Sequence, residues 1–291
     1  MDQSDLFQNI KNGNIEKCRE ILSSQPNLIN KYFYGVTPLM YSIECEQEEI
    51  AFELCQTSGV DLSLKDNLDS TLLEKSIEYK MFKIIEYLCQ NFKKSVVNDY
   101  YLENGETYLT SAIKSGENQT VKAFVNGKID VNKPNKSNQY PIQLAIKFNK
   151  ISILKELLKA DNVYIGTFDN GYNPLLDACE NDMTDIALVL IENGADINIC
   201  DQDQNWTPLM HAICNNNEIL VSKLLENGCD LAMVDFNRNT PVHLAVLTEN
   251  EYILRLLLKY NVNKNLENSE NLTPLQIAQL NDDENSIRLL S

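Results

Sequence analysis

One short phrase recurs along this chain about every 33 residues: it reads NWTPLMHA at residues 205–212 and NTPVHLA at residues 239–245. The second position of its Thr-Pro core falls, in successive copies, at Pro38, Leu72, Tyr108, Pro141, Pro174, Pro208, Pro241 and Pro274. One further step of 33 residues back reaches Asp5, so the period predicts nine repeats over the whole chain. A fixed period of this length is typical of proteins that stack one small structural element many times.

Each repeat carries the same signals for local structure. Thr207 can cap a helix with its hydroxyl, and Pro208 suits the first helical position, where no backbone N–H is needed. A second, more apolar run follows at residues 218–225, and Asn227-Gly228 then ends it. The polar stretch DLAMVDFNRN that comes next is too short for a third helix. The repeat is therefore predicted to be helix, turn, helix and an extended turn, the finger.

Three stretches show the whole pattern: NPLLDACENDMTDIALVLIENGADINICD from residue 173, TPLMHAICNNNEILVSKLLENGCDLAMVD from residue 207 and TPVHLAVLTENEYILRLLLKYNVNKN from residue 240. They resemble ankyrin repeats, and the resemblance extends over the full chain. It implies an all-α ankyrin-repeat solenoid of helix-turn-helix repeats with β-turn fingers, built as a curved rod. We expect a single domain at 1–291, because a solenoid grows by adding layers. Its repeats start near residues 4, 37, 71, 107, 140, 173, 207, 240 and 273.

The third repeat, residues 71–106, departs from the pattern. Leu72 replaces the proline, Lys80 stands where the turn between the helices often has glycine, and the exit loop is longer and contains Tyr100 and Tyr101. In a one-dimensional stack, a weak interface divides cooperative unfolding. We therefore expect hydrogen exchange to open repeats one to three separately from repeats four to nine. The alternative is that the two tyrosines pack the loop onto the rod.

The chain carries a formal net charge of −17. This charge argues against nucleic acid as a partner, because binding phosphate requires a basic track. It serves either solubility alone or the attraction of a protein partner with a basic surface. No signal peptide or membrane span is recognisable, and the eight cysteines form no CxxC pair. We expect a monomer in the cytoplasm or the nucleus that does not bind membranes.

The sequence offers no recognisable residues for catalysis or cofactor binding. Its two histidines, His211 and His243, both lie in the helix-opening phrase, where a hydrogen bond to a neighbouring turn would explain them. No zinc set, phosphate-binding glycine loop or Gly-x-Ser-x-Gly elbow occurs. We therefore predict no enzyme activity, no catalytic residue, no metal and no cofactor.

The family resemblance implies a non-enzymatic protein–protein interaction module, such as a scaffold, an adaptor or a stoichiometric inhibitor of a basic protein. A microbial effector that acts on host proteins is an alternative within this class. A small-ligand or nucleotide binder that uses the groove is the alternative outside it. Titration with nucleotides and capture of partners from a lysate would separate the two classes.

Ankyrin-like solenoids bind mainly through the finger tips and the inner face of the first helices, the concave groove. Here the tips are predicted just before each helix cap, at Val36, Ser70, Glu106, Gln139, Tyr172, Trp206, Asn239 and Leu272. The first helices end on the groove side near Glu44, Glu78, Lys114, Lys147 and Glu180. Acidic and basic bands are therefore predicted to alternate along the groove and to set the register of a partner.

Four aromatic residues near the tips are predicted to bind the partner: Phe168, Tyr172, Trp206 and Phe236. Equivalent tips in adjacent layers should lie roughly 10 Å apart, which would let the rings form a continuous strip. Aromatic side chains at the centre of an interface supply a large buried area and dominate hot spots. The competing interpretation is that Trp206 lies against the neighbouring finger and only stiffens it.

Overall fold

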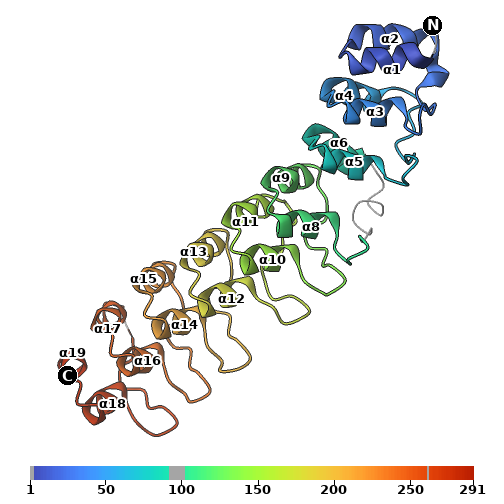
Figure 1. Ribbon diagram of the computed structural model, residues 1–291. Coiled ribbons are helices and arrows are strands. Elements are labelled where there is room, and N and C mark those ends of the chain that lie inside the picture. Colours follow the sequence, from blue (N-terminus) through green and yellow to red (C-terminus); the bar gives the residue numbers. More distant parts are fainter. Residues whose placement is uncertain (1–2, 92–101, 261) are drawn as a thin grey trace. The chain divides into compact units, whose positions relative to one another are not determined.

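The computed structural model describes residues 3–91, 102–260 and 262–291 (Figure 1). Regular structure in these ranges is helical, apart from isolated bridges that join Phe33 to Val36 and Lys65 to Thr71. The helices come in pairs, and each pair holds a first and a second helix joined by a short turn. The predicted all-α stack of helix pairs is confirmed.

By its internal contacts the chain divides into two compact units. Unit 1 comprises residues 1–144 and 152–163, and unit 2 comprises residues 145–151 and 164–291. Helices α10 (Pro141–Lys147) and α11 (Ile151–Leu157) lie where the chain passes from one unit to the other. The single domain over residues 1–291 stays a prediction.

Unit 1 contains the helix pairs of the first four repeats. They are α1 (Gln3–Lys11), α2 (Ile15–Ser24) with the short 3₁₀ helix η1 (Pro26–Leu28), α3 (Pro38–Glu44), α4 (Glu48–Gln56), α5 (Leu72–Glu78), α6 (Phe82–Asn91), α8 (Tyr108–Ser115) and α9 (Asn118–Asn126). The first helices α1, α3 and α5 pack side by side in one row, and the second helices α4, α6 and α9 pack in another (Figure 1).

Unit 2 contains the last four helix pairs. They are α12 (Pro174–Glu180), α13 (Thr184–Glu192), α14 (Pro208–Cys214), α15 (Glu218–Glu226), α16 (Pro241–Leu247), α17 (Glu251–Leu258), α18 (Pro274–Leu280) and α19 (Glu284–Leu290). The even-numbered helices form the row of first helices, and the odd-numbered helices form the row of second helices.

The first helices begin at the predicted caps. The Thr207 hydroxyl accepts the N–H of Met210 at 3.3 Å. In the third repeat, Thr71 and Glu74 form a reciprocal capping box: the Thr71 N–H donates to the Glu74 carboxylate at 2.7 Å, and the Glu74 N–H donates to the Thr71 hydroxyl at 3.2 Å. The proline that Leu72 replaces is therefore not needed to start α5. The predicted Tyr100-Tyr101 loop lies outside the described residues.

The turn between the two helices of a repeat contains one residue in the left-handed backbone region. Glycine fills this place at Gly13 and Gly116, with φ of 71° and 76°. Other residues fill it elsewhere, with φ between 50° and 56°: Glu46, Lys80, Asn149, Asp182, Asn216, Glu249 and Asp282. Side chains with a Cβ strain this conformation, so most repeats accept a small cost at the turn.

The core between the two rows of helices is aliphatic. Helix α15 buries four side chains along one face: Leu220, Val221, Leu224 and Leu225. Cys179 is buried on α12, and burial raises the pKa of its thiol to about 12. The thiol is therefore neutral and unreactive at physiological pH. It fills space as a small apolar side chain.

Candidate protein-binding surface

Each finger is a short loop that closes on itself before the next first helix. In the finger at residues 66–70, the Asp66 N–H donates to the Ser70 carbonyl oxygen at 3.1 Å. The Asp66 carboxylate accepts the N–H groups of Leu68 and Ser70 at 2.9 and 2.8 Å. Aspartate or asparagine takes the same place at Asn135, Asp201, Asp235 and Asn268. The recurring acidic or amide side chain therefore holds the loop closed.

The exposed tip of a finger lies earlier in the chain than the sequence analysis predicted. In the 66–70 finger the exposed residues are Asn67, Leu68 and Asp69. The predicted tip positions lie at the base of their fingers: Val36, Glu106 and Asn239 are buried, and Ser70, Gln139, Tyr172, Trp206 and Leu272 are half-buried. The hydrogen bond that closes the loop is the reason, because it draws the residue before the cap beneath the next helix.

Neighbouring fingers are joined edge to edge within each unit. In unit 1 the Asn67 N–H donates to the Gly35 carbonyl oxygen at 3.0 Å. In unit 2 the Phe236 N–H donates to the Gln204 carbonyl oxygen at 3.0 Å. Because each finger also closes on itself, these tips form a braced row and not a set of free loops.

The four predicted aromatic residues do not form one strip. Phe168 takes the place of the Asp or Asn that begins most fingers, and it is only 7% exposed. Its ring packs 5.0 Å from the Tyr164 ring and 6.2 Å from the Tyr172 ring. The Tyr172 hydroxyl donates to the Asp177 carboxylate at 2.8 Å. Burial, and then the Asp177 charge, raise the pKa of Tyr172. These rings stabilise their own finger.

Trp206 packs against the helix that follows it. Its ring lies 5.3 Å from the His211 ring on α14, at an interplanar angle of 73°. The indole Nε1 is buried and has no hydrogen-bond partner among the described residues. Phe236 differs, because it lies at a true tip and is 66% exposed. No ring contact in the described part of the chain joins Phe236 to Trp206 or Trp206 to Tyr172.

Glu44, one of the five predicted groove charges, is held in a network between two repeats. Its carboxylate lies 2.5 Å from the Lys75 ammonium, which also lies 2.9 Å from the Asp66 carboxylate. Burial opposes the charge of Lys75, but the two carboxylates outweigh it and raise the pKa of Lys75. Burial also opposes the charge of Asp66, but Lys75 and the finger amides lower the pKa of Asp66. The network ties α3, α5 and a finger together.

Lys114 is held in a similar way, and three predicted groove charges are exposed. The Lys114 ammonium lies 2.6 Å from the Glu106 carboxylate, which also accepts a hydrogen bond from the Asn135 amide at 3.1 Å. The exposed charges are Glu78, Lys147 and Glu180. The predicted alternation of acidic and basic bands is therefore wrong at Glu44 and Lys114, because each of these side chains is paired with an oppositely charged side chain of the stack. A role in partner binding for any of the five stays a prediction.

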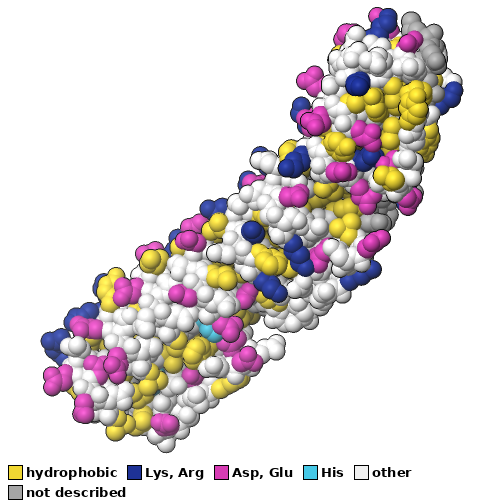
Figure 2. Space-filling view, in the orientation of Figure 1, with side chains coloured by type: hydrophobic (Ala, Val, Ile, Leu, Met, Phe, Trp, Pro, Cys, Tyr) yellow, Lys and Arg dark blue, Asp and Glu magenta, His cyan; other side chains and the backbone are white. Residues whose placement is uncertain are grey.

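Sequence reasoning missed several exposed apolar side chains. Tyr34 and Leu68, at two neighbouring tips in unit 1, are 90% and 78% exposed. Leu247 and Leu280, the last residues of α16 and α18, are also exposed. The signal for these two was their spacing, since they follow their helix caps by the same seven positions as Glu180. Figure 2 shows hydrophobic side chains gathered over α3 and the loops beside it.

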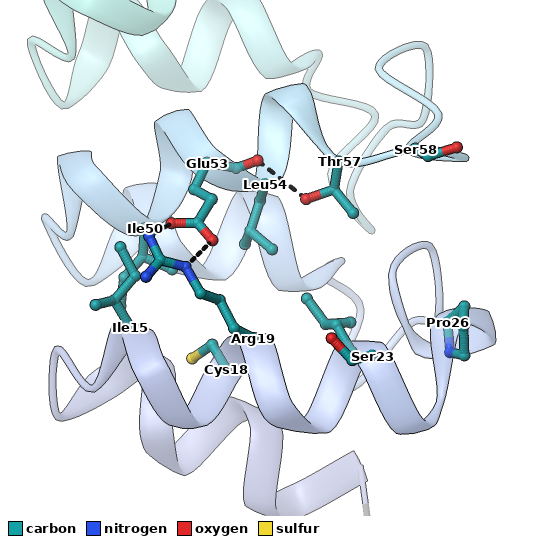
Figure 3. Close-up of a pocket in the computed structure, with 11 residues that line it drawn as sticks. Ile15, Cys18, Arg19, Ser23, Pro26, Ile50, Glu53, Leu54, Thr57 and Ser58 are labelled. Atoms are coloured by element: carbon teal, nitrogen blue, oxygen red, sulfur yellow. Dashed lines mark hydrogen bonds and ion pairs between the residues drawn. The ribbon is translucent and has the colours of Figure 1, made fainter.

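A cavity of about 380 Å³ lies between the second helices α2 and α4 (Figure 3). Arg19 on its wall bonds both carboxylate oxygens of Glu53, at 2.5 and 2.7 Å, and the Glu16 carboxylate at 2.6 Å. The guanidinium donors that would bind a phosphate group are therefore already engaged. This cavity does not favour nucleotide binding.

Both histidines hold local structure. The Thr240 N–H donates to His243 Nδ1 at 3.1 Å, and His243 Nε2 lies 3.1 Å from the Leu272 carbonyl oxygen. Burial lowers the pKa of His243, although the Leu272 carbonyl oxygen opposes this effect. His211 Nε2 lies 2.8 Å from the Asp201 carboxylate, which closes its own finger. The predicted hydrogen bonds to turns are present.

The described residues contain no group of three or more His, Cys, Asp or Glu side chains arranged to hold a metal ion. None of the helices in residues 3–91, 102–260 and 262–291 has the length and apolar character needed to cross a membrane.

Stacked helix pairs with fingers between them define a helical repeat protein. The family model of ankyrin repeats matches residues 6–99, 109–201, 162–235 and 209–291, and the chain belongs to the ankyrin repeat family. Repeats of this family are generally non-catalytic interaction modules.

Among solved structures, the chain is similar to a crystal structure of the ankyrin repeat domain of Bcl-3, described as a member of the IkappaB protein family. The TM-score is 0.50 at 21% sequence identity, and the match covers 89% of this chain and 99% of the Bcl-3 chain. At this identity the likeness supports the fold alone.

Proposed function

We propose that this chain is a non-enzymatic protein-interaction module that binds its partner on the finger face, the surface formed by the finger tips and the first helices. The observation that carries the proposal is that large apolar side chains are exposed on braced tips in each unit: Tyr34 and Leu68 in unit 1, and Phe236 in unit 2. Exposed apolar side chains on a rigid surface are typical of sites that a partner covers.

The charge of the chain suggests the chemistry of the partner. A net charge of −17 would attract a protein with a basic surface and speed its association. We expect a monomer that acts in the cytoplasm or the nucleus as a scaffold, an adaptor or a stoichiometric inhibitor. A microbial effector that acts on host proteins would use the same face.

Affinity capture from a lysate of the source cells tests this function. The full chain is compared with a variant that carries Tyr34→Asn, Leu68→Ser and Phe236→Asn. A control variant carries Ile219→Ser and Tyr252→Ser, which change exposed apolar residues on the second helices α15 and α17. We expect the first variant to lose specific partners that the control keeps, and binding to weaken as salt screens the acidic surface.

Two results would contradict the proposal. One is capture of the same partners by the finger-face variant and by the unchanged chain. The other is saturable binding of a nucleotide by calorimetry together with no protein partner, which would support the small-ligand alternative.

A further inference from the structure

A cleft lined by aromatic rings lies at the N-terminal end of the finger face. Its volume is about 450 Å³, and it lies between α1, α3 and the first two fingers. We call it the aromatic cleft, and its rings are Phe7, Phe33, Tyr34 and Tyr41. The Phe7 ring packs 4.9 Å from the Phe33 ring and 5.0 Å from the Tyr41 ring. The rings come from three chain segments and meet at the cleft, whose lining also includes the polar side chains of Ser4, Gln8, Lys11, Glu44 and Asn67.

Tyr34 has a backbone conformation that a bulky side chain does not favour. The N–H of Phe33 donates to the Val36 carbonyl oxygen at 2.9 Å, and the N–H of Val36 donates back at 3.2 Å, so the finger is a two-residue hairpin. Its central residues Tyr34 and Gly35 have φ of 50° and 85°. Hairpins with two positive φ angles favour Asn-Gly, because a bulky side chain strains the first position.

The Tyr34 ring is also almost fully exposed to solvent, at 90%. Its one recorded ring contact among the described residues is with Phe33 at 4.3 Å. A strained backbone that carries an exposed aromatic ring gives the fold little stability in return. An exposed ring that adds little to the stability of its hairpin is available to a partner.

The next finger extends the apolar surface. A Cβ atom on Gly35 would lie 2.7 Å from the Asn67 side chain, so glycine is needed for the two fingers to approach. Leu68 follows at the second tip and is 78% exposed. Tyr34 and Leu68 therefore stand on adjoining, hydrogen-bonded tips beside the cleft.

Charge around the cleft indicates what kind of chain would enter it. The wall carries Lys11 as well as Glu44, and Glu44 is already paired with Lys75. A cationic side chain would therefore find no free carboxylate inside. Outside, Glu46 and Glu78 are exposed at the ends of α3 and α5, and residues 1–91 hold fifteen Asp and Glu against eight Lys and Arg.

We infer that the aromatic cleft binds one large apolar side chain of a protein segment that carries Lys or Arg on both sides of it. The inference rests on the proposed function and specifies the partner of its N-terminal fingers. The apolar side chain would pack on Phe7, Phe33 and Tyr41 beneath the Tyr34 ring. The basic flanks would be attracted by the negative charge of residues 1–91, which hold fifteen Asp and Glu against eight Lys and Arg.

A library of random 16-residue peptides displayed on phage, selected against the immobilised full chain, tests the chemistry. We expect enriched peptides to share a Trp, Phe or Leu with Lys or Arg on either side. Enrichment of acidic peptides, of peptides without an apolar anchor, or of no peptide would overturn the inference.

The site is tested with the most enriched peptide, by fluorescence anisotropy. Tyr34→Asn should weaken binding at least tenfold, as expected for a hot spot, with the melting temperature unchanged or raised because Asn suits the hairpin. Leu68→Ser should weaken binding by a smaller factor. Arg238→Asn is the matched control, since Arg238 lies at a tip in unit 2 with φ of 59°. It should leave binding within about twofold.

Other outcomes identify a different site or occupant. If the peptide binds Tyr34→Asn as tightly as the unchanged chain but binds Phe236→Asn less tightly, the cleft is rejected as the site. The proposed function would still stand. Self-association of the full chain in sedimentation, abolished by Tyr34→Asn, would show that a second copy occupies the cleft and would also reject the inference.

Discussion

His243 shows how an ionisable side chain is accommodated inside the stack. It is fully buried, and its neutral ring accepts one hydrogen bond at Nδ1 and donates another from Nε2. The pKa of His243 is lowered from 6.5, chiefly by burial. Protonation therefore favours the unfolded chain, so the stabilisation by this residue is present above pH 6.5 and is lost as the pH falls below that value.

His243→Gln should remove this loss of stability. Glutamine can accept the same cap hydrogen bond, as Gln276 does from the Thr273 N–H at 2.8 Å. Urea unfolding between about pH 7.5 and 5.5 should show a steeper fall in the free energy of unfolding for the natural chain than for the variant. Parallel pH curves for the two proteins would contradict the explanation.

Trp206 and Phe236 should respond differently to truncation. Trp206 packs on α14, so Trp206→Ala should lower the free energy of unfolding by about 1–3 kcal/mol. Phe236 is exposed at a tip, so Phe236→Ala should change it by less than about 0.5 kcal/mol. Urea unfolding measures both values. If the two substitutions lowered the free energy of unfolding equally, Phe236 at the finger tip would be as well packed as Trp206 at the finger base.

At the scale of the repeat, the third helix pair is more regular than its sequence suggests. Its capping box replaces the missing proline, and α6 packs against both α4 and α9. Lys80 is strained in the turn, as the equivalent residues of most repeats are, and a cleft of about 220 Å³ lies between α5 and α8.

Lys80→Gly should stabilise the protein by about 1 kcal/mol, because φ of 56° strains a side chain with a Cβ and the lysine is exposed. Gly116→Lys, in the equivalent turn of the fourth repeat, is the reciprocal test and should destabilise the protein by a similar amount. Thermal unfolding of the two variants should shift in opposite directions. A shift in the same direction would show that the turn conformation does not limit stability.

At the scale of the whole molecule, the division of contacts bears on cooperative unfolding. The sequence predicts that the stack weakens at Thr107, after the third repeat. The two compact units meet in sequence within residues 145–163, and α6 packs on α9 across Thr107. Repeats that share an interface open together, and a weaker junction separates them.

Hydrogen exchange of the full chain in moderate urea should therefore resolve two groups of amides. We expect α6 and α9 to open with one free energy, and the helices of unit 2 to open with another. If helices before and after Thr107 opened with different free energies, the weak junction would lie after the third repeat. One common free energy for all helices would favour the single domain predicted from the sequence.

Nearest-neighbour chemistry explains which features could be read from the sequence. The period, the Thr-Pro caps, the Asn-Gly stops and the helix pairs all depend on interactions within a few residues or within one repeat. These signals identified the ankyrin repeat fold. They also indicated that the two histidines make hydrogen bonds to turns, as the structure shows.

The surface was harder to predict, because exposure depends on how one repeat covers the next. Trp206 and Tyr172 look like tip residues in the sequence, but loop closure turns them under the following helices. Glu44 looks free until Lys75 of the next repeat pairs with it. Tyr34 carries no motif; its own hairpin gives it a strained and exposed position, and the bond from Asn67 to Gly35 places the next tip beside it. Contacts between residues about 30 positions apart therefore decided which side chains a partner can reach.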